Sequence, residues 1–365
     1  MGEIILEKQR EIDMLKEFSN ANAISGFEHE FVKLFADKIN PYANVESDGM
    51  LNLYAYRNEN TGNKPVVQLD AHSDAVGFMT QAVRPNGQIK FVPVGGWVKY
   101  NIPGTKVKIK NKEGEFIPGV VATKPPHFMS ESEKNSVPEI SEMSIDVGAS
   151  TRQETLEVYK IDTGCPIFVD VECMFNEKTG IFFGKDFDDR FGAAVMVTVL
   201  EELQGVDSKM DIVAALSSQE EVGLRGAYVT ARKIKPDVSI VLESCPADDT
   251  FTPDWLSQTG LNRGPMLRDM DTTFIPNPKF QQYVCDLADK KGIPYTRSVR
   301  TGGGQDGAAI YYENGAPTIV IGIPVRYEHS PYCFATYHDY RAAVELTKAI
   351  LTDLDIEKLK SFKSF

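Results

Sequence analysis

The chain has 365 residues, with 39 Lys and Arg against 52 Asp and Glu, so its formal net charge is −13. A hydrophobic content of 42% is ample for a buried core and excludes general disorder. The acidic balance argues against nucleic-acid binding, and no apolar run reaches the roughly 18 residues of a transmembrane helix. We therefore expect neither a nucleic-acid partner nor a membrane partner.

Apolar periodicity predicts helices and strands that alternate towards both ends of the chain. Helices are expected at residues 5–18, 25–39, 190–203, 225–233, 278–291, 308–313 and 340–353, and strands at 66–71, 211–216, 238–242 and 318–322. Strands separated by helices are typical of a mostly parallel sheet that is covered on both faces. The sequence therefore predicts an α/β fold.

The texture of the sequence changes in the middle of the chain. Between about residues 78 and 165 helical periodicity fades, and short apolar runs are separated by Gly and Pro turns. Short apolar runs separated by such turns are typical of a small β-rich module or barrel. We expect one discontinuous catalytic domain, residues 1–76 and 166–365, with a β-rich domain inserted at residues 77–165.

The cysteines bear on the cellular compartment. All five are scattered along the chain, and no two form a CxxC pair. In a chain of this length they are typical of reduced thiols. The first eighteen residues are charged throughout, unlike the apolar region of a signal peptide. We therefore expect a cytoplasmic protein.

Side chains that can bind metal ions follow the predicted strands or precede a predicted helix. They are His72, Asp74, Asp188, Glu220, Glu221, Glu243 and His329. In open α/β sheets, sites form at the carboxyl ends of the strands, so we expect these side chains to converge. Bare carboxylates packed together would repel one another, and a divalent cation removes that repulsion. Mixed histidine and carboxylate ligation suits zinc, cobalt or manganese, and carboxylates can bridge two ions.

Each of these residues also has an alternative explanation. A histidine at a strand end such as His72 is more often a core residue, and Asp188 could cap the helix that follows it. Glu220 could be a solvated surface charge. The convergence of all five strand-end and helix-start signals favours a site. The other histidines have no comparable neighbourhood and are expected to be structural or on the surface: His29, His127 and His338.

Five sequence motifs resemble the M42 family of dinuclear metallo-aminopeptidases, which includes glutamyl aminopeptidases, deblocking aminopeptidases and tetrahedral TET peptidases. The motifs are DAHSDAVGFM at 70–79, GKDFDDRFG at 184–192, SQEEVGLRG at 218–226, GGGQDGA at 302–308 and IGIPVRYEHSP at 321–331. The resemblance spans nearly the whole chain. It implies a phosphorylase/hydrolase-like α/β sandwich with an inserted β-barrel-like domain.

The resemblance also implies two divalent metal ions per subunit, with zinc or cobalt expected. One ion would be held by His72 and Glu243. The other would be held by Glu221 and His329, while Asp188 would bridge both. In the family the ligand at the position of Glu243 is usually Asp, so we expect ligation with a shifted geometry.

The implied activity is removal of the N-terminal residue from short peptides by a water that bridges the two ions. Glu220 would be the general base and acid, and Asp74 would orient His72. The family also implies a homo-oligomer, of which the tetrahedral dodecamer is one form, and a role for the inserted domain in assembly and substrate access. Ala75 and Gln305 depart from the family pattern. The preferred N-terminal residue stays open, because acidic, neutral and basic preferences all occur in the family.

Two other functions are considered. Relatives carry endoglucanase labels, but glycoside hydrolysis needs a free pair of carboxyl groups about 5–9.5 Å apart, and the carboxylates here are grouped with histidines. A catalytically silent scaffold is the second alternative, and the presence of Glu220 argues against it.

Overall fold

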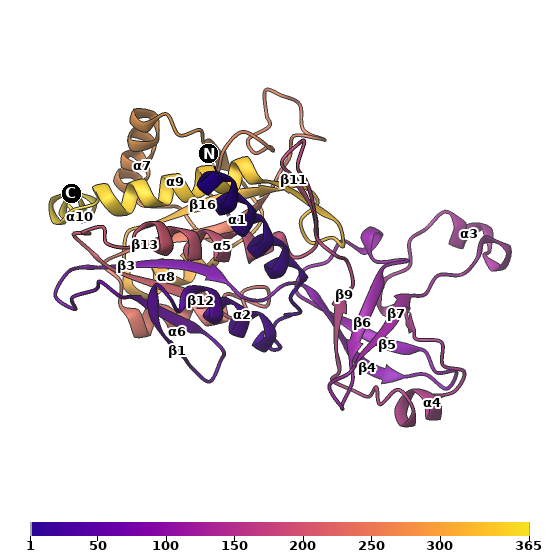
Figure 1. The fold of residues 1–365 in the computed structure, drawn as a ribbon. Helices are drawn as coiled ribbons and strands as arrows, with labels where there is room; N and C mark the ends of the chain where they lie inside the picture. Colours follow the sequence, from indigo (N-terminus) through magenta and orange to yellow (C-terminus); the bar gives the residue numbers. More distant parts are fainter. Residues whose placement is uncertain (1, 365) are drawn as a thin grey trace.

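The computed structural model describes residues 2–364, which form a helix-covered sheet with a separate closed barrel beside it (Figure 1). The α-helices are α1 (Gly2–Asn20), α2 (His29–Ile39), α3 (Glu131–Lys134), α4 (Arg152–Glu157), α5 (Phe187–Glu202), α6 (Arg225–Ile234), α7 (Pro278–Lys291), α8 (Asp306–Asn314), α9 (Tyr337–Asp353) and α10 (Ile356–Lys363). The strands are β1 (Ala43–Ser47), β2 (Leu53–Arg57), β3 (Val66–His72), β4 (Gly77–Val83), β5 (Ile89–Val94), β6 (Lys106–Lys110), β7 (Phe116–Val121), β8 (Ile145–Asp146), β9 (Pro166–Val169), β10 (Met174–Asn176), β11 (Ile181–Gly184), β12 (Asp211–Ser217), β13 (Val238–Pro246), β14 (Met266–Met270), β15 (Thr296–Val299), β16 (Thr318–Val325) and β17 (Cys333–Thr336).

The main sheet has eight strands in the order β1-β2-β12-β3-β13-β16-β14-β15. Its centre is parallel, because β12, β3, β13 and β16 all run in the same direction. Ser217 lies opposite His72, and Glu243 lies opposite Gly322. The carboxyl ends of these strands therefore lie along one edge of the sheet, where sites form in open α/β folds.

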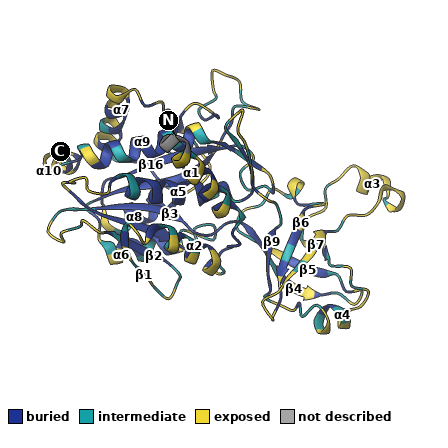
Figure 2. Cartoon of the chain, viewed as in Figure 1, coloured by how far each residue is buried: buried dark blue, intermediate teal, exposed yellow. Residues whose placement is uncertain are grey.

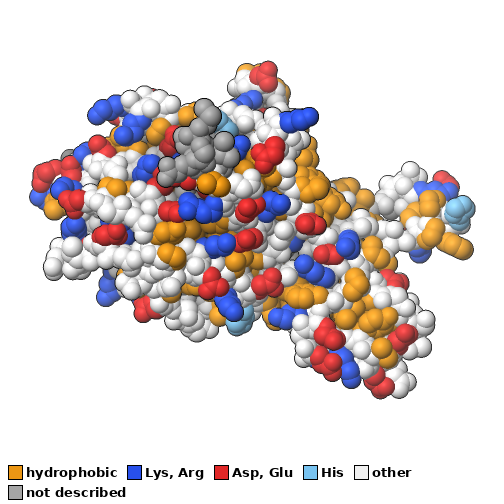
Figure 3. All heavy atoms as spheres, viewed as in Figure 1, with side chains coloured by type: hydrophobic (Ala, Val, Ile, Leu, Met, Phe, Trp, Pro, Cys, Tyr) orange, Lys and Arg blue, Asp and Glu red, His pale blue; other side chains and the backbone are white. Residues whose placement is uncertain are grey.

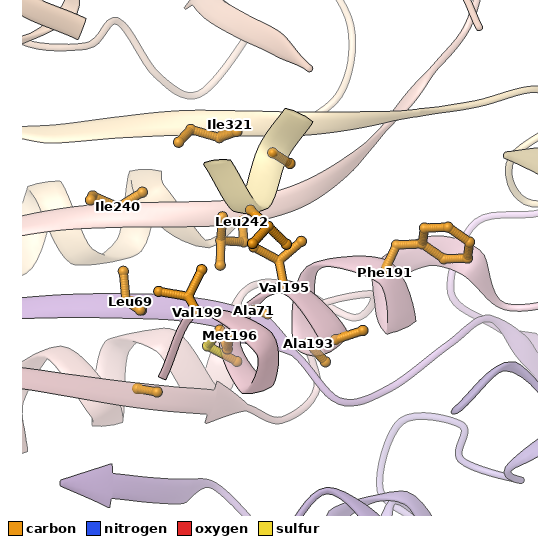
Figure 4. Close-up of a cluster of buried hydrophobic side chains, with 14 of the residues drawn as sticks. Leu69, Ala71, Phe191, Ala193, Val195, Met196, Val199, Ile240, Leu242 and Ile321 are labelled. Atoms are coloured by element: carbon orange, nitrogen blue, oxygen red, sulfur yellow. The ribbon is translucent and has the colours of Figure 1, made fainter. Parts of the chain in front are cut away.

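Helices cover both faces of this sheet because successive side chains on a strand point to opposite faces. Ile240 and Leu242 of β13 pack into the large core cluster that includes α5, as Figure 4 shows. Val241, between them, belongs to a second cluster with residues of α6 and α8. Figure 2 shows the central strands and α5 buried. The predicted α/β sandwich is confirmed.

The segment between β3 and α5 contains every strand of a closed barrel, whose strand order is β4-β5-β8-β7-β6-β9. The barrel has its own hydrophobic core, which includes Phe78, Phe91 and Ile109. The expected β-barrel is therefore confirmed. Its last strand, β9, starts after residue 165 and pairs with β4 and β6. The division into domains at residues 77 and 165, and the role of the inserted domain, stay predictions.

Two central strands are longer than the sequence pattern predicted. β13 was expected to end at Leu242 and β16 at Gly322, but they run to Pro246 and Val325 in register with each other. Glu243 therefore lies within a strand and not after it. Its carboxylate reaches the site from the strand itself.

The surface carries charges of both signs. On the face in Figure 3, Lys and Arg side chains are interspersed with Asp and Glu side chains over the main sheet and its helices. Among residues 2–364, none of the helices combines the length and the apolar character that crossing a bilayer requires. All five cysteines are buried and free.

Candidate metal centre

The five predicted ligands meet at the carboxyl edge of the main sheet, in two groups that share Asp188. The groups are His72, Asp188 and Glu243, and Asp188, Glu221 and His329. Within each group, one potential ligand atom per residue lies within 4.8 Å of the others. Both groups are therefore compact enough to surround a single ion each.

Asp188 lies between the two imidazole rings. Its Oδ1 is 2.9 Å from His72 Nε2, and its Oδ2 is 3.3 Å from His329 Nε2. Asp188 is near the start of α5 but has non-helical backbone angles, φ −78° and ψ 112°. The preceding residue, Phe187, is fully buried and anchors this turn. One carboxylate thus presents one oxygen to each group.

His72 is held in one orientation by its own strand end. Its Nδ1 donates to the backbone carbonyl of Asp74 at 2.9 Å, so in the neutral ring Nε2 keeps its lone pair. Glu243 Oε1 lies 3.4 Å from that Nε2. A histidine whose other nitrogen is bound to a carbonyl is the usual arrangement of a metal ligand.

The contact between Asp74 and His72 differs from the expected one. The Asp74 carboxylate is 3.5 Å from His72 Nδ1, further than the carbonyl. The carboxylate instead accepts hydrogen bonds from Ser25 Oγ at 2.5 Å, from Glu220 N at 2.9 Å and from Glu221 N at 3.2 Å. Burial opposes ionisation, but the nearby His72 ring and the hydrogen bonds from Ser25 and Glu220 outweigh it and lower the pKa of Asp74. This fully buried anion therefore organises the backbone that carries the two glutamates.

The donor atoms of the two groups could hold divalent cations. Glu221 Oε1 is 3.3 Å from His329 Nε2, yet it is buried and meets no donor with hydrogen-bond geometry among residues 2–364. Leaving such an oxygen unsatisfied is costly. Two imidazole nitrogens and three carboxylates form the mixed donor set that zinc, cobalt or manganese accepts.

The charges in the cluster support the same interpretation. Burial raises the pKa of Glu243 to about 7, and the neighbouring Asp188 adds to the rise. Burial lowers the pKa of His72, but the carboxylates of Glu243, Asp188 and Asp74 outweigh it and raise the pKa well above the ordinary value. The cluster therefore stabilises positive charge strongly, as a cation site must.

Glu220 lies beside the two groups but in neither of them. It lines the cavity that lies next to the cluster. Burial raises the pKa of Glu220 well above its ordinary value, and the charges of Glu243, Asp306 and Glu221 add to the rise, although His72 opposes it. A carboxylate tuned in this direction suits general acid–base work near neutral pH.

The cavity next to the cluster has a volume of about 920 Å³. It is also lined by Glu328 and Arg268, two charged residues that the sequence analysis missed. Glu328 Oε1 is buried and accepts no hydrogen bond from the described residues. A glutamate immediately before the histidine His329, and an arginine inside an apolar strand pattern, were the available signals.

The remaining singled-out residues lie around or outside the site. Ala75 is buried and pairs with Ile24, while Gln305 caps the start of α8 and lines the cavity. The other histidines are in neither ligand group: His29, His127 and His338.

An α/β sandwich with such a cluster at its sheet edge is typical of peptide hydrolases that use metal ions. The family model described as M42 glutamyl aminopeptidase matches residues 52–346, and the chain belongs to this peptidase family. The resemblance found in the five motifs is confirmed. The chain is a peptide hydrolase of the aminopeptidase class.

Several curated relatives and solved structures are similar to this chain along almost their whole lengths. The glutamyl aminopeptidase of Lactococcus lactis is 29% identical over 97% of this chain and 99% of its own. The lysyl aminopeptidase of Pyrococcus furiosus is 29% identical over 94% of this chain and 97% of its own. A TET aminopeptidase from a marine sediment Thaumarchaeota archaeon has a TM-score of 0.92 at 30% identity, over 97% and 99%. The TET1 peptidase of Pyrococcus horikoshii, which can assemble into a tetrahedron or a large octahedral shell, has a TM-score of 0.85 at 26% identity, over 94% and 100%.

Proposed function

We propose that this chain is a metal-dependent aminopeptidase that removes the N-terminal residue from short peptides. The observation that carries the proposal is the pair of ligand groups that share Asp188, with Glu220 next to them. Family membership supports the peptide substrate.

The proposed ligands divide into two sets. His72 and Glu243 would hold one ion, Glu221 and His329 the other, and Asp188 both. Zinc or cobalt is proposed because the donor set mixes imidazole with carboxylate. When bound, two such ions acidify a water molecule and polarise the scissile carbonyl.

Glu220 is proposed to move the proton. Its carboxylate would accept a proton from the attacking water and deliver it to the leaving amine. The hydrogen bond from its backbone N–H to Asp74 supports this role, because it fixes where the side chain starts. Glu221, bound through its own N–H to the same carboxylate, would be directed to the metal side.

We also propose that the chain forms a homo-oligomer. The similar Pyrococcus horikoshii peptidase can assemble into closed shells. Location in the cytoplasm stays a prediction from the reduced cysteines. Both proposals are independent of the chemistry at the site.

Hydrolysis by metal-stripped protein tests the function. Aminoacyl-p-nitroanilides with acidic, neutral and basic residues should be cleaved only after Zn²⁺ or Co²⁺ is added. A cellulose or glucan substrate serves as the parallel arm. Glycan cleavage that continues in the presence of EDTA, with no peptide hydrolysis, would contradict the proposal and favour glycoside hydrolysis. Folded, metal-loaded protein that cleaves nothing would indicate a silent scaffold.

A further inference from the structure

The loop that carries His329 connects β16 to β17 and is called the His329 loop here, residues 326–332. Arg326 and Phe334 close it, because Arg326 N donates to Phe334 O at 2.9 Å and Phe334 N donates to Arg326 O at 3.2 Å. The loop contributes both Glu328 and His329 to the cavity. The position of one proposed ligand therefore depends on what fixes the conformation of this loop.

Two residues of the His329 loop have left-handed backbone angles. The φ angle is 61° at Tyr327 and 56° at His329, and neither residue is a glycine. Side chains other than glycine rarely adopt this conformation, and they keep it only where the surrounding structure holds them there. Contacts within the protein must therefore support the loop.

Aromatic contacts support the loop where it meets solvent. The ring of Tyr332 stacks on Phe183 with the centroids 5.8 Å apart, and the ring of Tyr327 meets Phe334 edge-on at 6.1 Å. Both tyrosines are about half exposed. Contacts open to solvent constrain a segment less than buried ones do, so these rings alone do not account for the loop conformation.

Cys333 contacts the loop from the protein interior. It is the first residue of β17 and is only 3% exposed. Its Sγ donates to Tyr327 O at 3.4 Å and to Ser330 O at 3.6 Å, so its one proton is shared between two acceptors. These carbonyls belong to the residues immediately before and after Glu328 and His329. The thiol therefore connects the two ends of the segment that carries the ligand.

The thiol is kept protonated and is firmly placed. Burial raises the pKa of Cys333, and the charge of Glu328 adds to the rise, so the sulfur keeps its proton and stays a donor. The backbone of Cys333 pairs with Gly184 of β11. Gly184 is four residues before Asp188 in the chain. The donor is therefore fixed to the strand that leads to the proposed shared ligand.

We infer that Cys333 is a positioning residue for the metal centre, because its thiol holds the His329 loop in the conformation that presents His329 to an ion. The inference rests on the proposed function and adds a residue that acts through a ligand. Without the donor, the two left-handed residues lose their buried support, and the imidazole is held less firmly beside Asp188 and Glu221.

The two ions should respond differently to the loss of this donor. The ion held by Glu221 and His329 should bind more weakly, whereas the ion held by His72 and Glu243 should not change, since neither of those residues is in the loop. A thiol is a weak donor, so the effect should be modest.

The first test measures metal affinity directly. Metal-stripped protein is titrated with Zn²⁺ against a competing chelator, and the bound ions are counted. We expect Cys333→Ala to raise the Kd of one ion by about 3- to 10-fold, the effect of one hydrogen bond. Cys333→Ser, which keeps a donor, should bind both ions as the wild type does. Cys285→Ala is the matched control, because Cys285 is also 3% exposed but lies in α7, outside the cavity lining.

Two results would overturn the inference and leave the proposed function standing. One is an unchanged affinity in Cys333→Ala, and the other is a loss that Cys333→Ser does not restore, since packing alone would then matter. Folded wild-type protein that binds no ion would overturn both. If Cys333→Ala does not fold, Cys333→Val replaces it, because valine fills the space without supplying a donor, and the same loss is expected.

A double variant separates positioning from a general loosening of the site. His329→Ala removes the ligand through which Cys333 is inferred to act. We therefore expect Cys333→Ala to cause no further change in the affinity of the remaining ion when it is added to His329→Ala. A further 3- to 10-fold loss of the remaining ion in the double variant, roughly the effect seen in the single one, would overturn the inference.

Discussion

Asp74, whose side chain is fully buried, accepts through Oδ1 a hydrogen bond from the backbone N–H of the half-buried Glu220 at 2.9 Å. The second oxygen of the same carboxylate accepts from Glu221 N at 3.2 Å. The residue proposed as the base and the residue proposed as a ligand thus share one buried anchor. Asp74 therefore acts more on the glutamate turn than on His72, whose closest contact is the Asp74 carbonyl.

Replacing Asp74 with Asn tests this anchor. Asn has only one carbonyl oxygen. Its NH₂ group would therefore face N–H or O–H groups that now donate hydrogen bonds to the carboxylate. We expect Asp74→Asn to lower metal affinity or activity by about 10- to 100-fold, the range found when groups that orient metal ligands are changed. Metal titration and kcat/KM measure it. Ser25→Ala, which removes only one donor to the anchor, should have a smaller effect; an equal or larger one would contradict the account.

Glu220→Gln removes the proposed proton carrier but keeps the size of the side chain. We expect kcat to fall by about 10²- to 10⁴-fold, the range for a general acid–base group. The bound metal, measured by mass spectrometry, should not change, because Glu220 is in neither ligand group. Wild-type turnover in this variant would remove Glu220 from the mechanism and revive the silent-scaffold alternative.

Asp188 is proposed to bind both ions, so replacing it should affect metal binding differently from replacing a residue that binds only one ion. We expect Asp188→Ala to weaken binding at both sites, whereas His329→Ala should weaken one. Counting ions per chain after dialysis against limiting zinc distinguishes the two variants. Loss of the same number of ions in both would contradict the sharing.

Glu28 should make stability depend on pH. Burial and the nearby Asp74 carboxylate raise its pKa from 4.5 to about 7. Between these values the folded chain keeps a proton that the unfolded chain releases, so stability is full below about pH 4.5 and is lost as the pH rises towards 7. The difference amounts to roughly 3 kcal/mol at most. Glu28→Gln should therefore gain stability relative to wild type across this window.

Urea unfolding at pH 5, 6, 7 and 8 checks the effect of Glu28. The control is Glu131→Gln, since Glu131 is an exposed residue in α3. Its free energy of unfolding should change with pH in parallel with that of the wild type. If the Glu28→Gln curve were also parallel, the buried carboxyl group would have no role in the pH dependence.

Local signals in the sequence were sufficient for several elements. α7 has the predicted bounds because Asn277 caps its first N–H groups, Pro278 fits the first helical position, and Gly292 adopts the left-handed conformation at its end. α2 starts later than predicted, at His29, because Ile24 pairs with Ala75 in the preceding turn. That pairing joins distant segments, which periodicity does not detect.

The site was less predictable than the fold. The strand-end rule found Glu243, although the predicted end of its strand was wrong: a charge normally ends a buried strand, and here pairing with β16 continues it. Arg268 and Glu328 were missed because a charged residue next to an apolar run is ordinary on a surface. Only the packing of β14 and of the loop before His329 makes them cavity residues.

The most direct measurement follows activity and bound metal together. Metal-stripped protein is titrated with Zn²⁺ or Co²⁺ while release of the N-terminal residue from a short peptide is recorded and the bound ions are counted. We predict no release without metal and full activity at two ions per chain. Full release by protein that holds no metal, or activity unaffected by a chelator that removes the ions, would contradict this prediction.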